Sequence, residues 1–488
     1  MTEMIVPHFH NDPGVSVIEI GAREFMCVGA TPPLDHPHVY LDMGGDSELI
    51  CPYCSTLYRF DPTLSPREAR PPECALPHLE RPEPGDRGVT APVLIAGAGI
   101  GGLTAALAIA RQGIPVTLFD QAERLEEAGA GIQLSPNATR VLIALGVADR
   151  IEPAVVVPEV VRLRAGGSAR DIAIMPLGTE VARRHSAPYW VVHRADLQRA
   201  LLAAVENDAL VTLKLGARID GFVPGPQGVT AEVSCREETG EHHGRLLIGA
   251  DGLWSRLRES LGADTGPRFA GRTAWRALAP SDTLPPSLRG QEVHLWIGPG
   301  GHLVHYPVRA GTTVNIVAVT SDDWQSTQWT TAADGGEVLS RFSPRLWARE
   351  ARELLAAPRR WQKWALYDRA PSANWGRGPV TLLGDAAHPM LPFLAQGAAM
   401  AVEDAFVVAA ALARFADDPA RALRDYERQR QPRTARVQRA ARRNDLVYHL
   451  GGLTARVRDA ALAALGGRRL LAQYDWIYRW SGPEQTLR

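Results

Sequence analysis

The sequence predicts an α/β protein, and three observations support that prediction. The apolar run "APVLIAGAG" (91–99) precedes a helix-like segment and then a second strand-like run, "PVTLFD" (115–120), which is a βαβ pattern. Residues of roughly 150–380 are richer in period-two alternation, as in "GHLVHYPVRAGTTVNIVAV" (301–319), which predicts a hairpin. Roughly the last hundred residues are rich in Ala and Arg at helical spacing. We therefore expect a parallel sheet with flanking helices, a β-rich region and a helical end.

Charge and hydropathy exclude several classes of protein. The 488 residues hold 53 Lys plus Arg against 54 Asp plus Glu, so no net field attracts the chain to nucleic acid or to an anionic membrane. No apolar run reaches the roughly 18 residues that span a bilayer, and the N-terminus lacks a basic segment followed by an apolar one. We expect a cytoplasmic protein whose partners are small molecules or other proteins.

The Arg-rich stretch "RALRDYERQRQPRTARVQRAARRN" (421–444) has two interpretations. Its arginines could form a nucleic-acid patch. Acidic residues are interspersed, however, and Leu, Tyr and Val recur on one face, which favours a solvated amphipathic helix.

Proline marks a boundary inside the chain. Residues 61–92 hold eight prolines and almost no apolar periodicity, which predicts an extended linker over 61–91 after a small module over 1–60. For the remainder we predict an α/β domain over 92–420, an interleaved β-rich substrate domain at about 155–190 and 265–370, and a helical region over 421–488.

A glycine motif follows the first predicted strand of the larger part. Gly97, Gly99 and Gly102 fit G-x-G-x-x-G and open the helix "GLTAALAIARQG". The first glycine permits a tight turn, the second lets backbone amides approach a pyrophosphate, and the third allows close packing of helix on strand. Asp120 ends the next strand, where a carboxylate would accept hydrogen bonds from ribose hydroxyls. This Rossmann-like context favours a dinucleotide site over a glycine turn without a ligand.

Two further motifs identify the cofactor. "LLIGADGLWSRLRESL" places Asp251 and Gly252 after an apolar strand, and "VTLLGDAAHPMLPFLAQGAAMAVEDA" places Asp385 after another, followed by a turn at Gly397. In this order the motifs resemble the FAD-dependent aromatic hydroxylases, flavoprotein monooxygenases of the para-hydroxybenzoate hydroxylase fold, and most of all the salicylate hydroxylase-like branch. "GAGIQLSPNATRVLIALGV", "HRADLQRALL" and "HLVHYPV" support the resemblance, which covers roughly residues 92–480.

The resemblance implies a role for each motif residue. The three glycines would receive the FAD pyrophosphate, Asp120 the ribose, Arg194 the phosphate region and Asp385 a ribityl hydroxyl. The amides of residues 395–398, including Gly397, would stabilise negative charge on the flavin. Asp251 lies in a segment that the family uses for FAD and pyridine nucleotide. An Asp that caps the following helix is an equal alternative.

The resemblance also implies the reaction. NAD(P)H would dock transiently and reduce the flavin, and O2 would then give a flavin C4a-hydroperoxide that hydroxylates a small aromatic compound such as a salicylate or hydroxybenzoate. No second G-x-G-x-x-G is evident in the sequence, so nothing marks a separate nicotinamide domain. The protein would supply orientation, exclusion of water and deprotonation of the substrate phenol.

The strands 271–280 and 301–310 are the expected walls of the substrate site. Alternation puts His305 and Tyr306 on opposite faces of their strand, and either face could look at the substrate. His305 could act as a general base, although a structural His paired across the strand is the more common case. Trp275 lies on the other strand and is expected in the substrate site with Arg276.

Two departures from the family put a conventional His base in doubt. Pro392 and Phe393 occupy positions where relatives carry polar residues, and Arg272 stands near the position of a His that relatives often show. Either Arg272 or Arg276 would bind a substrate carboxylate or phenolate, with Tyr306 assisting, or the substrate needs little deprotonation. Both arginines could instead form ion pairs that support the fold.

The N-terminal module holds a candidate metal site. Cys27 and His36 precede the C-x-x-C pair of Cys51 and Cys54, and three thiolates with one imidazole favour a closed, structural zinc site. A redox dithiol is the main alternative. "HPHVYLDM" and "CPYCSTLYRF" are predicted strands that would bring His36 to the cysteines. The segment resembles the small CHCC-type zinc-finger family over residues 17–60, which favours His36 over His38 and implies docking to a protein partner or packing on the enzyme.

These observations predict an FAD-dependent NAD(P)H aromatic hydroxylase with a structural zinc module. A rival interpretation keeps the flavin but makes the chain an accessory or assembly subunit of a respiratory complex, docked through the zinc module. A milder alternative changes only the substrate. Cys74 and His78 remain outside both sites and are expected to be unliganded.

Overall fold

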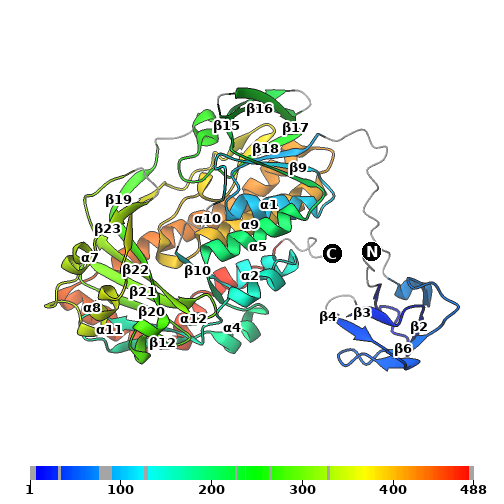
Figure 1. Ribbon diagram of the computed structural model, residues 1–488, viewed down its shortest axis with the longest axis horizontal. Helices are drawn as coiled ribbons and strands as arrows, with labels where there is room; N and C mark the ends of the chain where they lie inside the picture. The colour runs from blue at the N-terminus through cyan, green and yellow to red at the C-terminus, as the bar shows by residue number, and fades with distance from the viewer. Residues whose placement is uncertain are drawn as a thin grey trace. The chain divides into compact units, whose positions relative to one another are not determined.

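The chain divides into two units, Met1–Arg87 and Gly88–Arg488, and each is described by itself. The structure is a computed structural model (Figure 1). It describes residues 7–30, 35–75, 91–125, 130–225, 228–236, 238–262, 266–326 and 330–482.

The first unit is built from two small sheets around an aromatic core. One sheet has the order β1 (His8–Phe9), β3 (Glu24–Gly29), β4 (Asp35–Asp42), and the other β5 (Glu48–Ile50), β6 (Leu57–Phe60), β2 (Val17–Ile20), β7 (Ala69–Arg70). The rings of Phe9, Phe25 and Tyr58 meet between them, with centroids 4.6 Å apart for Phe25 and Tyr58. These rings pack in a small core that also holds aliphatic side chains such as Ile18 and Ile20.

The first unit extends beyond its predicted end. β7 pairs with β2, the 3-10 helix η1 (Pro72–Cys74) follows, and Ala75 bridges to Phe9. Ala69 and Cys74 are buried, because the unit needs these apolar groups to close its small core. The predicted linker over 61–91 therefore begins too early, since residues 61–75 belong to the unit, while 76–90 lie outside the described residues.

The second unit begins with a parallel sheet of the predicted type. Its order is β14 (Val211–Leu215), β9 (Val116–Asp120), β8 (Val93–Ala96), β18 (Leu246–Gly249), β26 (Val380–Leu382), β25 (Gly376–Arg377). All neighbours are parallel except β25, which pairs antiparallel with β26. Every residue of β8 and β18 is buried, as expected of apolar strands covered on both faces.

Three helices pack together beside this sheet (Figure 1): α1 (Ile100–Ala110), α5 (Arg194–Glu206) and α9 (Gly397–Arg414). α1 is buried over almost its whole circumference, because its sequence "IGGLTAALAIA" has no polar face. Two smaller sheets complete this part of the fold: β10 (Gly131–Leu134) with β13 (Trp190–His193), and β15 (Ala217–Gly225), β16 (Gly228–Cys235) and β17 (Glu238–Gly244).

The β-rich region is a mixed sheet of eight strands. Its order is β12 (Asp171–Pro176), β11 (Val160–Ala165), β20 (Glu292–Gly298), β21 (Gly301–Val308), β22 (Thr313–Ser321), β19 (Arg268–Pro280), β24 (Trp361–Asp368), β23 (Thr331–Ala333). β21 and β22 form the predicted hairpin, with the turn at residues 309–312. All of its strands come from two separate stretches of the chain, 160–176 and 268–368, which lie within the predicted substrate domain.

The two faces of this sheet have different neighbours. The outer face carries Trp275, Trp296 and Leu303 and is covered by α7 (Gly335–Arg341) and α8 (Arg349–Ala356), with which it forms a closed apolar core. The inner face carries Arg276, Tyr306 and Asn315. β10 lies directly against it, because a Cβ on Gly131 would stand 2.5 Å from the Tyr306 ring and 2.8 Å from Asn315.

The remaining helices connect these sheets. They are α2 (Pro136–Ala144), α3 (Ala148–Ile151), α4 (Gly178–His185), α6 (Arg256–Ser260), α10 (Pro419–Tyr448), α11 (Gly452–Leu465), α12 (Gly467–Ala472) and α13 (Asp475–Tyr478), with the 3-10 turns η2 (Glu152–Ala154), η3 (Ser281–Thr283), η4 (Pro286–Leu288), η5 (Gly384–Ala386) and η6 (Pro392–Leu394).

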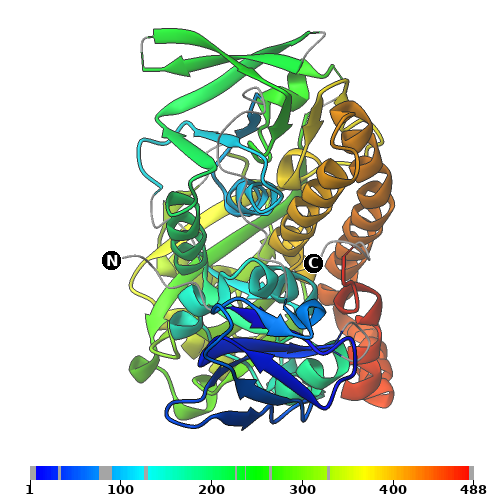
Figure 2. The same cartoon turned by 90° about the vertical axis from the view of Figure 1, so that its right-hand side faces the viewer.

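The Arg-rich segment forms α10, and the interpretation as an amphipathic helix is confirmed. The Asp418 side chain caps the helix by accepting from the amide of Arg421. Leu423, Tyr426 and Val437 are buried on one face, and α10 runs beside α9 (both orange in Figure 2). Arg430 departs from the solvated pattern, because its side chain is only 1% exposed.

Arg430 is buried because it neutralises two carboxylates of α9. Its guanidinium lies 2.5 Å from Glu403 Oε2 and 2.6 Å from Asp404 Oδ1. The other Asp404 oxygen accepts from the Gly384 amide at 3.0 Å and pairs with the His388 ring. Although burial alone raises the pKa of Asp404, His388 and Arg430 outweigh it and hold that pKa at about 2. The cluster ties η5, α9 and α10 together.

Replacement of Arg430 by Ala should destabilise the second unit by about 3–5 kcal/mol, since it removes the buried cation that Glu403 and Asp404 share and leaves each carboxylate with one remaining partner, Arg433 or His388. Urea unfolding followed by tryptophan fluorescence measures this. Arg428→Ala is the matched control: it removes an exposed guanidinium of the same helix, which pairs with Asp425, and should cost less than about 1 kcal/mol. Equal effects of the two variants would contradict the assignment.

Candidate functional site

The glycine turn has the geometry that the motif predicts. Gly97 has φ +100°, and a Cβ there would stand 2.4 Å from the Ala250 carbonyl oxygen. A Cβ on Gly102 would stand 1.8 Å from the Gly97 oxygen, so helix and strand can pack this closely only without a side chain. At Gly99, the residue that precedes α1, no atom lies within 4 Å of the same position. The turn is therefore open where a pyrophosphate would approach the amides.

Asp120 lies at the end of β9 and is partly committed to this turn. One of its carboxylate oxygens accepts from the Ala98 amide at 2.7 Å and the other from the Ala122 amide at 2.9 Å. Each oxygen keeps a second lone pair, which can accept from a ribose hydroxyl. The Ala98 carbonyl in turn accepts from Gln198 of α5 at 3.3 Å, a contact that the sequence motifs did not reveal.

Asp385 follows β26 at the carboxyl edge of the sheet, the same edge as Asp120, and Arg194 at the start of α5 lies close enough to interact with its charge. The Asp385 side chain is exposed while Gly384 and Ala386 on either side are buried. Although the side chain keeps an exposed surface, the protein atoms packed around it desolvate the carboxyl group and raise the pKa of Asp385, while His388 and Arg194 oppose that rise. A Cβ on Gly397 would stand 3.9 Å from Asp385 Oδ1, so the carboxylate reaches the start of α9.

The turn before α9 is fixed by a buried polar network. Ala395 adopts a left-handed conformation with φ +52°, and Gln396 then precedes the helix. Gln396 Nε2 donates to Ser135 Oγ at 2.9 Å, and Asn137 Nδ2 donates to Glu403 Oε1 at 2.6 Å. The amides that begin α9, including that of Gly397, are thereby held at a site where they can stabilise an anion.

Asp251 serves α6 in this structure. Its Oδ2 accepts from the Leu257 amide at 3.3 Å, which agrees with the capping alternative, although Ser255 is the residue that precedes the helix. Its Oδ1 is buried and has no hydrogen-bond partner in the described part of the chain. Burial raises the pKa of this carboxyl group. An orphaned oxygen beside Gly97 leaves room for a cofactor contact as well.

These features fit FAD. The open amides at Gly99 suit a pyrophosphate, and the free lone pairs of Asp120 and Asp385 suit sugar and ribityl hydroxyls. Arg194 adds a cation. Burial lowers the pKa of Arg194, and the Asp385 carboxylate opposes that change.

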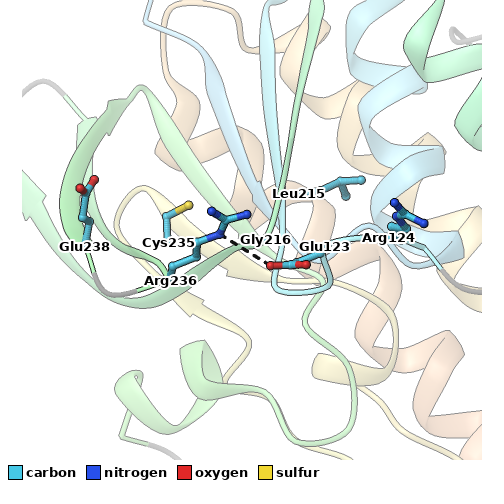
Figure 3. Close-up of a pocket in the computed structure, with 7 residues that line it drawn as sticks. All are labelled: Glu123, Arg124, Leu215, Gly216, Cys235, Arg236 and Glu238. Carbon is cyan, nitrogen blue, oxygen red and sulfur yellow. Dashed lines mark ion pairs between the residues drawn. The ribbon is translucent and has the colours of Figure 1, made fainter.

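A cavity of about 740 Å³ lies elsewhere, next to the ends of β9 and β14 (Figure 3). Glu123 and Arg236 form an ion pair at 3.7 Å across it, and Cys235 points into it. None of the FAD-site residues that the sequence predicts lines this cavity. Its lining is polar and exposed, and we assign it no role in the reaction.

The inner face of the eight-stranded sheet carries the substrate-site candidates. Arg276 stacks on Trp364 with its guanidinium carbon 4.7 Å from the ring centre, and its Nε has no hydrogen-bond partner among the described residues. Burial lowers the pKa of Arg276 to about 10, so it stays charged at neutral pH. Tyr306 stands beside it and bonds to Gln133 of β10, which accepts from Tyr189 at 2.7 Å.

His302 also lies on this face, and sequence reasoning missed it. It precedes Tyr306 by four residues in β21, so the two side chains lie on the same face of the strand. His302 is 3% exposed, and its ring meets the Phe393 ring edge-on with centroids 5.2 Å apart. Phe393 is buried in η6, directly before the turn that opens α9, whereas Pro392 is exposed. The signal was present in "HLVHYPV": of its two histidines, only the first shares a face with Tyr306.

Two predicted site residues lie on the outer face, and a third, Arg272, shares the inner face but is engaged in an ion pair. His305 and Trp275 belong to the outer face, where His305 stacks on His294 with centroids 4.3 Å apart and Trp275 is fully buried. The interpretation of His305 as a structural His paired across the strand therefore holds. Arg272 forms an ion pair with Asp445 of α10 at 2.8 Å, which is the fold-supporting alternative. Period-two alternation places His305 and Trp275 on the outer face, and the position of α10 brings Asp445 to Arg272.

The cysteines of the first unit meet as predicted. The sulfur atoms of Cys27, Cys51 and Cys54 all lie within 4.8 Å of one another, and the Cys27 and Cys54 sulfurs are 3.6 Å apart. The Tyr58 hydroxyl donates to the Cys27 sulfur at 3.0 Å, which stabilises a thiolate there. Three converging, largely buried sulfurs fit a structural zinc ion.

The strands reach this arrangement differently from the prediction. β4, which contains His36, pairs with β3 and thus with Cys27, whereas the Cys51–Cys54 turn joins β5 to β6. The His36 side chain lies outside the described residues, so the fourth ligand stays a prediction. Cys74 is buried in the core of the unit and is not part of the sulfur cluster.

Together, the glycine turn, the two strand-end carboxylates and the anion-stabilising start of α9 define a flavoprotein with an inserted substrate sheet. A family model described as "FAD binding domain" matches residues 90–441, and one described as "Zinc-finger domain" matches residues 22–58. The chain therefore belongs to the FAD-dependent hydroxylases whose motifs it resembles, and it carries a zinc-finger module in addition.

Curated relatives agree with this assignment. The chain is 37% identical to 3-hydroxybenzoate 6-hydroxylase 1 of Aquipseudomonas alcaligenes over 390 residues, which cover 79% of this chain and 97% of that protein. It is 32% identical to 6-hydroxynicotinate 3-monooxygenase of Bordetella bronchiseptica, over 72% of this chain and 91% of that protein.

A solved structure agrees as well. Klebsiella pneumoniae HpxO complexed with FAD and uric acid matches with a TM-score of 0.70 and 27% identity, over 80% of this chain and 97% of that chain. Within the described residues, no helix is long and apolar enough to cross a membrane.

Zinc should be lost when one of its cysteines is replaced. In Cys51→Ser we expect the zinc bound to purified protein, measured by atomic absorption, to disappear and the first unit to unfold, since its small core depends on metal binding. FAD binding by the second unit should persist. Cys74→Ser is the control in the same unit and should keep the metal; loss of zinc there as well would make Cys74 a ligand.

Proposed function

We propose that the chain is an NAD(P)H-dependent monooxygenase that hydroxylates a hydroxybenzoate-type aromatic acid. Support comes from the relatives, which are hydroxylases of 3-hydroxybenzoate and of 3-amino-4-hydroxybenzoate. One observation carries the assignment beyond homology: a buried imidazole, a phenol and a guanidinium, those of His302, Tyr306 and Arg276, share the inner face. This set can recognise a carboxylate and deprotonate a phenol in one place.

Bound FAD, reduced by NAD(P)H, would supply the oxygen-transfer chemistry. The residues of this chain would make the ring electron-rich. The His302 ring is neutral, because burial and the neighbouring His449 hold its pKa well below the ordinary value. Its lone pair is therefore available for the phenolic proton, although the same shift makes the ring a weak base. Proton removal increases electron density on the ring and so favours attack on an electrophilic oxygen.

Arg276 is suited to hold the carboxylate. Its Nε has no hydrogen-bond partner in the part of the chain that the structure describes, and its planar guanidinium stacks on Trp364, which fixes its orientation for a bidentate pair. In the sheet register, Arg276 is opposite Val317, and Val317 is opposite Val304, which is two residues from His302. By standard strand spacing, the Cα atoms of Arg276 and His302 are therefore roughly 12 Å apart. The arginine side chain and a benzoate ring can bridge that span.

The sulfur module is proposed to dock a protein partner. Ile50 and Tyr53 beside the cysteine turn are 60% and 62% exposed, which is unusual for large apolar side chains in so small a unit. Catalysis by the second unit does not need this module in the mechanism proposed here.

Oxidation of NADH by the FAD-loaded protein should accelerate when 3-hydroxybenzoate is added, and a hydroxylated product should appear by mass spectrometry. His302→Asn should lower the product-forming rate by about 10²–10⁴-fold at pH 7, because the general base is lost. The rate should recover as pH rises toward the phenol pKa of about 10 and the substrate ionises in solution.

His294→Asn is the matched control for His302→Asn. His294 is an equally buried histidine of the outer face, at 2% exposure, and its loss should not alter the pH profile. Identical profiles for the two variants would contradict the role of His302.

Arg276→Gln should raise the Kd of 3-hydroxybenzoate about ten- to hundredfold, the loss expected for a charge-assisted hydrogen bond. Perturbation of the flavin absorption spectrum measures this Kd. Benzyl alcohols, which lack the carboxylate, should bind both forms alike. Arg164→Gln, which removes an arginine stacked on Trp296 of the outer face at 4.5 Å, should leave the Kd unchanged. An unchanged Kd in Arg276→Gln would remove the anchor from the proposal.

A further inference from the structure

Two hydroxyl groups stand directly against the sulfur cluster of the first unit. The Tyr58 hydroxyl oxygen is 3.0 Å from Cys27 Sγ, and Thr56 Oγ1 is 3.2 Å from Cys54 Sγ. Tyr58 is 0% exposed and Thr56 is 3% exposed. Each hydroxyl is therefore a fixed neighbour of one sulfur rather than a group that exchanges partners with bulk water.

The local backbone brings both hydroxyls to the cysteines. Thr56 directly precedes β6 and Tyr58 lies within it, so the two side chains are two residues apart and share a face. The backbone of Thr56 also closes the cysteine turn, because its carbonyl accepts from the Cys51 amide at 3.0 Å. The order C-x-x-C-x-T-x-Y over residues 51–58 thus places two hydroxyls behind the sulfurs.

Asn11 fixes the direction of the hydrogen bond at Thr56. The Val15 amide can only donate, and it meets Asn11 Oδ1 at 2.8 Å, so the other end of the Asn11 side chain is its NH2 group. That Nδ2 donates to Thr56 Oγ1 at 2.9 Å and to the Val15 carbonyl at 2.8 Å. Because Thr56 Oγ1 accepts from Asn11, its own hydrogen is available for the Cys54 sulfur.

The sulfur cluster needs such donors when zinc is bound. Three thiolates and a neutral fourth ligand around Zn²⁺ leave an excess negative charge, and the side chains of Cys27 and Cys51 are buried. Burial makes that charge costly unless hydrogen-bond donors face it. A zinc-bound sulfur is a thiolate, which accepts but cannot donate, so each hydroxyl is the donor in its contact with sulfur.

We propose that Tyr58 and Thr56 are positioning residues of the zinc site, and that their hydroxyls set its affinity for the metal. Tyr58 donates to the Cys27 thiolate and Thr56 to the Cys54 thiolate, while Asn11 orients the Thr56 hydroxyl. The two O–H···S bonds draw negative charge from the sulfurs and hold them in place for the ion. This role is independent of the reaction proposed for the second unit.

The ring of Tyr58 allows its hydrogen bond to be separated from its packing. The ring packs on Phe25 with centroids 4.6 Å apart, and Phe25 precedes Cys27 by two residues in β3. The strand that supplies the sulfur therefore also holds the ring that carries its donor. Phe at position 58 keeps this contact and removes only the oxygen.

The test compares Tyr58→Phe and Thr56→Val with the controls Tyr53→Phe and Thr63→Val in the full chain. The controls remove hydroxyls from exposed residues of the same unit, Tyr53 in the cysteine turn and Thr63 beside Asp61. Competition with a chromophoric chelator measures the zinc Kd. We expect it to rise about 10–100-fold in each donor variant and to stay unchanged in the controls.

Cobalt(II) in place of zinc distinguishes a hydrogen bond from packing. A thiolate that loses an O–H donor holds its lone pairs less tightly. The sulfur-to-cobalt charge-transfer band should therefore move to longer wavelength in Tyr58→Phe and Thr56→Val and stay in place in the two controls. Thr56→Ser, which restores a hydroxyl, should return the band to its wild-type position.

Asn11→Ala tests the orienting contact. Its effect on the zinc Kd should be less than additive with that of Thr56→Val, since both changes act on the same hydrogen bond. Additive effects would remove Asn11 from the scheme.

Two results would overturn the proposal as a whole. An unchanged zinc Kd in both donor variants would mean that the hydroxyls do not act on the metal. A raised Kd with an unmoved cobalt band would mean that they act only through packing. If Tyr58→Phe binds too little cobalt for a spectrum, Thr56→Val and Thr56→Ser decide, and the same band in both would overturn the proposal.

Discussion

The buried contact of Arg430 with Glu403 and Asp404 is the interaction on which the rest of the second unit depends. Removing these charges from water is costly, and their mutual pairing, with Arg433 on Glu403 and His388 on Asp404, offsets that cost. Through Asp404 the cluster holds the Gly384 amide and His388, and through Glu403 it holds Asn137. Segments that are far apart in the sequence therefore meet at one point, and the turn that opens α9 is fixed there.

That fixed turn connects the cofactor residues to the substrate sheet. η6 carries Phe393 onto His302, and the next residues present amides at the start of α9. On the other side, Gly131 of β10 touches Tyr306 and Asn315 so closely that no side chain would fit. The inner face of the sheet is thus placed against the cofactor residues by packing, while the outer face is closed by its own apolar core. The inner face is therefore the one on which we propose that the substrate binds.

The two units use different physical means to reach stability. The second has a large apolar core and can bury charged networks within it. The first has only a few aromatic rings and aliphatic side chains, so three cysteines and the bound metal supply what the core lacks. Tyr58 links the apolar core to the cysteine site, since its ring belongs to the core and its hydroxyl oxygen bonds to Cys27.

The sequence by itself determined the groups that local geometry controls. The glycine turn, Asp120, Asp385 and the three cysteines could be predicted because each depends on a few adjacent residues and on backbone chemistry. The functional face of the β-rich sheet could not. Alternation separates His302 and Tyr306 from His305 and Trp275, but only the packing of β10 on one face and of α7 and α8 on the other tells which set lies in a closed apolar core. The partners of Arg272 and Arg430 were equally hidden, because an ion pair between distant segments leaves no periodic trace in the chain.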